Sequence, residues 1–209
     1  IPLQKSKCPN ANCSADAANI MVERNPASET NDSNLTDEQL IARTGRGDLA
    51  AFECLVERYQ QPALRTARRF VGDEHEAEDL AQEAFLQVFR HAHRYKPEAA
   101  SFKTWFYTIL TNLCRNTLKK KNPSYFAEPP FELATPDDPA RALELRERRR
   151  ALSRAILNLP LNQRLAFVLC HYEQFSYAEA ALSLDLSVKA VESLLVRAKR
   201  KLREELMGA

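Results

Sequence analysis

The sequence predicts an all-α protein with two small helical domains joined by a proline-rich linker, the second of them a helix-turn-helix domain. Only four glycines occur in 209 residues, which disfavours an architecture of strands and tight turns. Apolar residues recur at spacings of three and four along most of the chain, and capping residues precede several of these segments. No run of about 18 apolar residues occurs, so we expect no membrane span and a cytoplasmic location.

The first domain is expected over residues 35–121 and begins with a capping box that starts at Thr36. Asp48 is expected to cap a second segment, and Pro62 is expected to start a third. Another segment follows the capping residue Asp73. Its apolar positions follow the helical repeat and predict one buried face, made of Ala77, Leu80, Ala81, Ala84, Phe85, Val88 and Phe89.

Residues 101–121 combine aromatic and basic side chains on one predicted helix, which Ser101 caps. Aromatic rings that stack on unpaired bases, with cations along the backbone, are typical of single-stranded DNA binding. The polar face has no carboxylate and is expected to expose Tyr107. A hydrophobic core alone would also explain most of these aromatic residues. The stripe expected in that core is Phe102, Trp105, Phe106, Ile109, Leu110 and Leu113.

The linker is expected over residues 122–139, which hold five prolines and show no helical period. The second domain is expected over residues 140–207. Near its end, Ser176 starts another capping box, and Ser187 is expected to cap a long basic helix. Two helices joined by a tight turn at Asp185, the second long and basic, indicate a helix-turn-helix.

The last helix carries a basic and polar stripe that fits a DNA major groove, with cations on phosphates and the first turns near base edges. A solvated face is the alternative for any such charge run, but the preceding helix and turn favour DNA binding. The stripe consists of Lys189, Ser193, Arg197, Arg200 and Lys201.

The net charge of +2 conceals an acidic stretch at residues 73–83 and basic stretches at 103–121 and 189–203. This segregation suggests two partners of opposite charge. A magnesium-dependent nuclease is the enzymatic reading of the acidic stretch, but its carboxylates spread around the helix instead of converging. A surface that docks on another protein explains it better. We expect no enzyme, no metal and no cofactor, because the sequence offers no nucleophile with a base.

Three stretches together resemble the bacterial sigma-70 family, in its short extracytoplasmic-function branch. They are DEHEAEDLAQEAFLQVFRH, SFKTWFYTILTNLCRN and LPLNQRLAFVLCHYEQFSYAEAALSLDLSVKAVESLLVRAKRKLREEL. The resemblance covers roughly residues 36–206 in order. It implies a sigma factor that binds core RNA polymerase, recognises the −10 and −35 promoter elements and melts DNA, in a stress response under an anti-sigma factor.

The resemblance also implies a role for individual residues. The surface that docks on the clamp helices of the polymerase largest subunit would use Asp79, Gln82, Glu83 and Phe85. The −10 element would be melted and read by Tyr95, Lys103, Trp105, Tyr107, Asn112, Arg115, Lys119 and Lys120. The second domain would contact the polymerase flap and read the −35 element with Ser187, Lys189, Glu192, Ser193, Arg197, Arg200 and Lys201.

Some positions depart from the family pattern. Asn116 and Lys119 stand where an aspartate and an arginine are common, and Asp185 stands at the usual turn glycine. The common Gly-Thr-Val-x-Ser-Arg of the −35 helix is here KAVESL, so we expect an altered −35 preference. A stand-alone helix-turn-helix regulator is the alternative function, and it leaves residues 73–121 unexplained.

Residues 1–34 are expected to form a disordered tail, because Asn, Ser, Ala and Pro dominate without a sustained period. Met21 is the first methionine, and we expect native translation to begin there. Cys8 and Cys13 lie in this tail, where neither a disulfide nor a metal site is expected. The remaining cysteines are expected to be small buried apolar residues, namely Cys54, Cys114 and Cys170.

Overall fold

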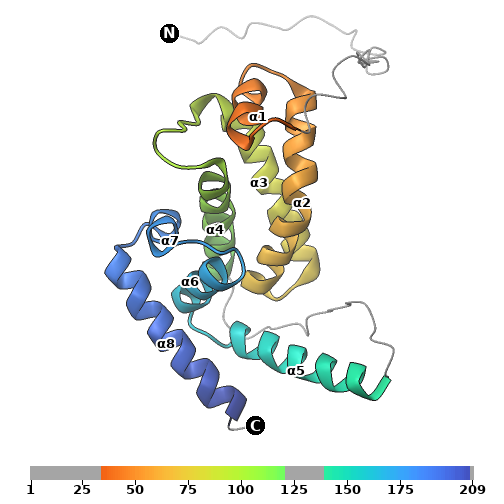
Figure 1. Ribbon diagram of the computed structural model, residues 1–209, viewed down its shortest axis with the longest axis vertical. Helices are drawn as coiled ribbons and strands as arrows, with labels where there is room; N and C mark the ends of the chain where they lie inside the picture. The colour runs from red at the N-terminus through yellow and green to blue at the C-terminus, as the bar shows by residue number, and fades with distance from the viewer. Residues whose placement is uncertain (1–33, 121–138, 208–209) are drawn as a thin grey trace, which may run out of the picture.

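The computed structural model describes residues 34–120 and 139–207. The predicted tail, most of the predicted linker, Cys8, Cys13 and Met21 lie outside these ranges. Two groups of helices lie against each other (Figure 1). The first contains α1 (Asp37–Thr44), α2 (Leu49–Val71), α3 (Glu74–His91), the 3₁₀ turn η2 (Ala92–Arg94) and α4 (Phe102–Lys120). The second contains α5 (Pro139–Leu157), α6 (Leu161–His171), α7 (Tyr177–Leu184) and α8 (Val188–Met207).

The all-α prediction is confirmed, since the described ranges contain helices and no strand. The predicted caps are also present. The Thr36 side chain accepts a hydrogen bond from the Gln39 amide at 3.3 Å, and Gln39 Oε1 accepts one in return from the Thr36 amide at 2.9 Å. Asp73 caps α3 by accepting from the Glu76 amide at 2.8 Å. These bonds satisfy amide groups that have no partner inside their helix.

Helix α2 differs from the sequence prediction, because it continues through Pro62 instead of starting again there. Proline removes one backbone hydrogen bond and crowds the carbonyl four residues earlier, at Arg58. The helix nevertheless continues, because Leu55, Ala63 and Ala67 on both sides of the proline are fully buried. Tertiary packing overrides the local signal of the proline at this position.

The core of the first group centres on four aromatic rings from α2, α3 and α4. Phe106 packs 5.1 Å from Phe85 and 5.4 Å from Tyr59, measured between ring centroids, and Phe102 lies 5.1 Å from Tyr59. The Tyr59 hydroxyl donates to Asp37 at 2.5 Å, which attaches α1 to α2. Burial, assisted by the Asp37 carboxylate, raises the pKa of Tyr59 well above its ordinary value.

In the second group, α7 and α8 form the predicted helix-turn-helix. The Ser176–Glu179 capping box begins α7, and Ser187 Oγ accepts from the Ala190 amide at 3.2 Å to cap α8. Asp185 ends α7 in the left-handed region with φ 55°, as expected where the family commonly has glycine. The apolar face of α8 buries Val191, Leu195, Ala198 and Leu202.

A buried arginine lies in the contact between the two groups, near the C-terminal ends of α2 and α5. Arg164 of α6 donates to the carbonyl oxygens of Phe70 at 2.6 Å and Leu159 at 3.3 Å, and also to that of Leu157. Its guanidinium therefore joins the C-terminal end of α2 to the end of α5. Gly72 ends α2 with φ 78° and leaves room for the Leu157 side chain, whose methyl carbons would lie 3.0 Å from a Cβ at that position.

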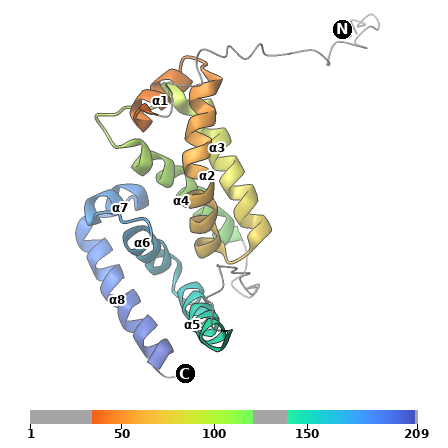
Figure 2. The ribbon, with the colours of Figure 1, turned by 45° about the vertical axis from the view of Figure 1, so that its right-hand side comes forward.

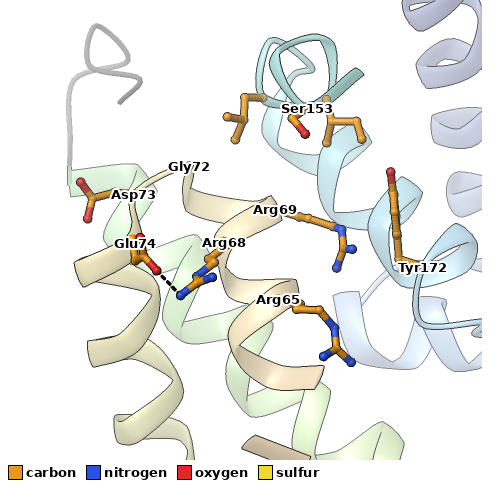
Figure 3. Close-up of a pocket in the computed structure, with 10 residues that line it drawn as sticks. Arg65, Arg68, Arg69, Gly72, Asp73, Glu74, Ser153 and Tyr172 are labelled. Carbon is orange, nitrogen blue, oxygen red and sulfur yellow. Dashed lines mark hydrogen bonds and ion pairs between the residues drawn. The ribbon is translucent and has the colours of Figure 1, made fainter. Parts of the chain in front are cut away.

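A small pocket of about 70 Å³ lies beside this contact (Figure 3). Arg68 on its wall is paired with Glu74, and Arg69 lies over the Tyr172 ring with its guanidinium carbon 4.1 Å from the centroid. Apolar atoms of Ile156 and Leu157 line much of the rest.

Candidate nucleic-acid interface

Helix α8 presents its predicted cationic and polar stripe to solvent. Arg197 is held in place by its own helix, with Nη2 donating to Ser193 Oγ at 3.1 Å. Lys201 Nζ donates to the Asn158 carbonyl at 2.9 Å, which fixes it beside the end of α5. In Figures 1 and 2, α8 forms the outer edge of the second group, away from α1–α4. All seven residues predicted to contact the −35 element are exposed: Ser187, Lys189, Glu192, Ser193, Arg197, Arg200 and Lys201.

The second predicted DNA surface is on α4, and its C-terminal part is open. Asn112, Lys119 and Lys120 are exposed and lie within the last turns of the helix. Cations at this end also interact favourably with the helix dipole. Because Lys119 and Lys120 are exposed, their ammonium groups remain available for phosphate contacts.

Tyr95 and Trp105 form a half-buried aromatic pair at the other end of α4. Their ring centroids are 5.3 Å apart, and the Tyr95 hydroxyl donates to the Ala100 carbonyl at 3.0 Å. That bond fixes the loop over residues 96–101, which extends beside α4 in Figure 1. Burial, with the nearby Glu38 carboxylate, raises the pKa of Tyr95 to about 12.

The expectation that Tyr107 is exposed is wrong in this structure. Tyr107 is 1% exposed, and its hydroxyl donates to Glu173 Oε2 at 2.6 Å. Its ring also packs edge-on against Phe175 with centroids 5.4 Å apart. Glu173 and Phe175 belong to the turn between α6 and α7, so the second group of helices covers this face of α4. Burial and the Glu173 carboxylate raise the pKa of the Tyr107 hydroxyl.

Two further residues predicted to contact the −10 element take part in the same contact between the groups. Lys103 Nζ donates to the Glu173 carbonyl at 2.5 Å and lies 5.0 Å from the Phe175 ring centroid. Arg115 Nη2 donates to the Leu184 carbonyl at 3.1 Å. Three of the eight predicted −10 residues thus bond to the second helical group: Lys103, Tyr107 and Arg115.

The predicted docking helix α3 has an exposed face, but Phe85 does not belong to it. Asp79 and Gln82 are exposed, and Glu83 accepts from Gln87 at 3.2 Å. Phe85 is only 9% exposed because its ring packs against Phe106. It supports the helix from inside the core and offers little surface to a partner.

The exposed face of α3 includes two apolar residues that the sequence analysis did not place there. Leu86 is 48% exposed and follows Gln82 by one helical turn. Phe89, which was expected in the core, is 40% exposed and rests on Phe52 with ring centroids 5.1 Å apart. Neighbouring exposed apolar side chains that are rimmed by polar ones are characteristic of protein-binding surfaces. The helical repeat places Leu86 outside the buried stripe of α3, so the sequence already indicated that this side chain would be exposed.

The described part of the chain contains no group of three or more histidine, cysteine, aspartate or glutamate residues placed to hold a metal ion. Among the same residues, no helix is long and apolar enough to cross a bilayer. Of the cysteines within the described ranges, Cys114 is buried as predicted, whereas Cys54 and Cys170 are only partly buried. Burial raises the pKa of the Cys114 thiol to about 12, which keeps it unreactive at neutral pH.

Sequence comparison agrees with this arrangement of two helical groups. Residues 55–123 match sigma-70 region 2, and residues 149–202 match sigma-70 region 4. The RNA polymerase sigma-H factor of Pseudomonas aeruginosa is 33% identical over 181 residues, covering 81% of this chain and 93% of the relative. The ECF RNA polymerase sigma-E factor of Escherichia coli is 33% identical over 178 residues, covering 79% and 91%.

The ECF RNA polymerase sigma factor SigW of Bacillus subtilis is 30% identical over 182 residues, covering 79% of this chain and 94% of the relative. Among solved structures, CnrH in complex with the cytosolic domain of CnrY is 28% identical with a TM-score of 0.64, covering 82% of this chain and 97% of that one. A sigma factor RpoE from Bartonella quintana, solved with the anti-sigma factor NepR, shares the fold at 21% identity and a TM-score of 0.60, covering 75% and 96%.

The chain therefore belongs to the sigma-70 family of transcription initiation factors, which are not enzymes. Within that family it is an extracytoplasmic-function sigma factor, as its relatives from Escherichia coli and Bacillus subtilis indicate.

Proposed function

We propose that this protein is the promoter-specificity subunit of a bacterial RNA polymerase, that it acts in the cytoplasm, and that an anti-sigma factor controls it. In this proposal α3 docks on the core enzyme, α4 captures the melted −10 strand, and α8 reads the −35 element. The observation that supports it most is the placement of three distinct exposed surfaces on three helices. The solved relatives bound to CnrY and to the anti-sigma factor NepR support the control mechanism.

The −35 preference and the domain boundaries complete the proposal. Lys189 and Glu192 lie on the first turns of α8 and are exposed, which supports their assignment to base contacts. Glutamate accepts a hydrogen bond from the cytosine amino group, whereas lysine donates to guanine or phosphate. We place the boundaries at residues 35–121 for the first domain, 122–139 for the linker and 140–207 for the second domain.

Docking on core polymerase gives the direct test of the proposed function. The protein is expected to co-elute with bacterial core RNA polymerase in gel filtration. The Gln82→Ala, Glu83→Ala variant is expected to bind core about tenfold more weakly, because each lost polar contact contributes about 0.5–1.5 kcal/mol. Competition with a labelled sigma factor measures that change.

The matched control is Glu57→Ala, Gln61→Ala on the neighbouring helix α2, which removes the same charge and amide from exposed positions. This control is expected to bind core as the unmodified chain does. Equal affinities for all three proteins would contradict docking through α3. A chain that elutes alone yet shifts duplex DNA would favour a stand-alone regulator.

Phosphate contacts by α4 predict a change in salt dependence. Lys119→Ala, Lys120→Ala is expected to weaken binding to promoter DNA across sequences and to flatten the plot of log affinity against log salt by roughly 1–2 units, because each phosphate contact releases about one counterion. Fluorescence anisotropy on open promoter DNA with the core enzyme present measures the slope. A slope identical to that of the unmodified protein would show that neither ammonium group contacts phosphate.

A further inference from the structure

A strongly exposed valine lies in the middle of the polar face of α8. Val196 is 69% exposed. Residues three and four positions apart are neighbours on a helix surface. The neighbours of Val196 on this face are all exposed and are polar or charged: Glu192, Ser193, Lys199 and Arg200. Polar side chains therefore surround one large apolar side chain on the helix that we propose for −35 recognition.

Packing within the chain does not account for this valine. The buried face of α8 lies on the other side of the helix and consists of Val191, Leu195, Ala198 and Leu202. A β-branched residue also forms helix less readily than lysine, arginine or glutamate, so valine gives no local advantage at a solvated position. A single exposed apolar residue needs no explanation elsewhere on a surface. On a face that enters a groove of DNA, its chemistry decides what it can contact.

The rise of the helix places Val196 within reach of base edges. An α-helix rises about 1.5 Å per residue, so Val196 lies about 10 Å along the axis from Lys189, and Arg200 lies about 16 Å from it. The major groove of B-DNA is about 12 Å wide. With the first turns of α8 in the groove, Val196 stays inside it, whereas Arg200 reaches the phosphates at its edge.

Thymine is the base whose major-groove edge matches an apolar side chain. It presents a C5-methyl group beside its O4 acceptor, whereas adenine, guanine and cytosine carry no methyl group. Lys189, Glu192 and Ser193 can donate or accept hydrogen bonds, but none of them recognises a methyl group. The two methyl groups of Val196 do the reverse. They contact an apolar group, and they leave a polar base edge without a partner, which costs free energy once water is excluded.

We propose that Val196 is a specificity-determining residue, whose methyl groups pack against the C5-methyl group of one thymine in the −35 element. This inference rests on the function proposed above for α8. Since it concerns one contact to one base, it predicts a sequence preference at a single position. The phosphate contacts assigned to Arg200 and Lys201 are independent of that preference.

The test separates the methyl group from the rest of thymine by means of deoxyuridine, which lacks only that group. Holoenzyme formed from the full chain and core RNA polymerase selects from two pools of randomised duplex DNA that are long enough for both promoter elements. One pool contains thymidine and the other deoxyuridine. At one position of the −35 element, the unmodified chain is expected to enrich thymine about fourfold more per round than uracil, because burying one methyl group contributes about that factor.

Val196→Ser is expected to abolish this difference between the pools, because it removes both methyl groups. Val196→Thr keeps the branched shape and one methyl group, so it is expected to retain part of the difference. Leu206→Ser is the matched control, since it removes an apolar side chain that is 42% exposed on the last turn of α8, beyond the groove. This control is expected to retain the whole difference.

Two results would overturn the role of Val196 while leaving −35 recognition by α8 intact. One is equal enrichment of thymine and uracil by the unmodified chain at every position of the −35 element. The other is a difference between the pools that persists undiminished in Val196→Ser. Selection of no −35 sequence from either pool would instead refute the proposed function of α8, and the inference about Val196 would fail with it.

Discussion

Phe106→Ala is expected to reduce the free energy of unfolding by about 3–5 kcal/mol, which is the usual range for removing a buried aromatic ring. Phe106 is fully buried and lies between rings from three helices, with Phe85, Tyr59 and Tyr107 all within 5.4 Å between centroids. The cavity left behind would be rigid on several sides, so collapse would recover little. Since a domain has roughly 5–15 kcal/mol of stability in total, the variant is expected to unfold partly at 37 °C.

Urea unfolding followed by far-ultraviolet circular dichroism measures this loss. Phe89→Ala is the matched control, because it removes the same ring from a position on α3 that is 40% exposed. We expect this substitution to reduce the free energy of unfolding by about 1 kcal/mol, because the Phe89 ring is only partly buried, against Phe52. If both substitutions cost the same, the aromatic cluster around Phe106 would not be the core of the first group.

Much of this fold could be predicted from the sequence because its signals are local. A cap such as Thr36 or Ser176 acts within one helical turn, and the apolar stripe of α3 needs only the helical period to be recognised. The same locality explains the failures. Pro62 is a local signal for a helix break, but tertiary packing overrides it. Phe89 follows the same helical repeat as the buried residues of α3, yet it is exposed because the core ends before this position.

The second buried face of α4 could not be predicted by the same reasoning. Thr104, Tyr107 and Thr111 are polar residues on the helix side opposite the apolar stripe, yet each is buried. Tyr107 is bonded to Glu173, which lies 66 residues away in the turn between α6 and α7, and α7 itself packs against α4. No periodic pattern in α4 encodes that partner. Pairing of polar groups across distant segments becomes visible only when the two helical groups are placed together.

Some residues of the candidate surfaces could likewise be located from the sequence, and others could not. The exposed positions on α8 follow from helical phase and charge, so sequence reasoning located Lys189, Arg197 and Arg200 correctly on the solvent side. Phe85 was assigned to polymerase docking by resemblance, but its side chain lies in the core. Glu173 had no signal at all, because one glutamate in a short turn is unremarkable until its partners are known.

Arg164 provides the second large effect, because it is charged, buried and donates to carbonyl oxygens of α2, of the end of α5 and of the turn before α6. Two opposing terms decide its contribution. Burial disfavours the charge and lowers the pKa of Arg164 below its ordinary value, although the guanidinium stays charged at neutral pH. Against this, it donates to the carbonyls of Phe70, Leu157 and Leu159. An unpaired buried carbonyl costs about 1–3 kcal/mol, and we expect the loss of all three hydrogen bonds to exceed the gain from no longer burying the charge.

Arg164→Met is therefore expected to destabilise the protein by about 2–4 kcal/mol, because methionine keeps much of the volume but donates no hydrogen bond. The stability of Arg164→Lys should lie between those of the unmodified protein and Arg164→Met, since an ammonium group does not span three acceptors as the guanidinium fork does. A neutral or stabilising Met variant would instead mean that desolvation dominates, as it does for some buried ion pairs.

The same substitution is expected to uncouple the two helical groups, since Arg164 of α6 bonds the end of α2. The single tryptophan, Trp105, lies on α4, so its fluorescence reports the first group, while circular dichroism reports every helix. In the unmodified protein the two urea curves should coincide, which is the behaviour of one cooperative unit. In Arg164→Met the dichroism curve should fall first, because the second group loses its anchor while the aromatic core around Phe106 is untouched. Coincident curves in the variant would show that the groups are held together chiefly by the α4–α7 contact and Glu173.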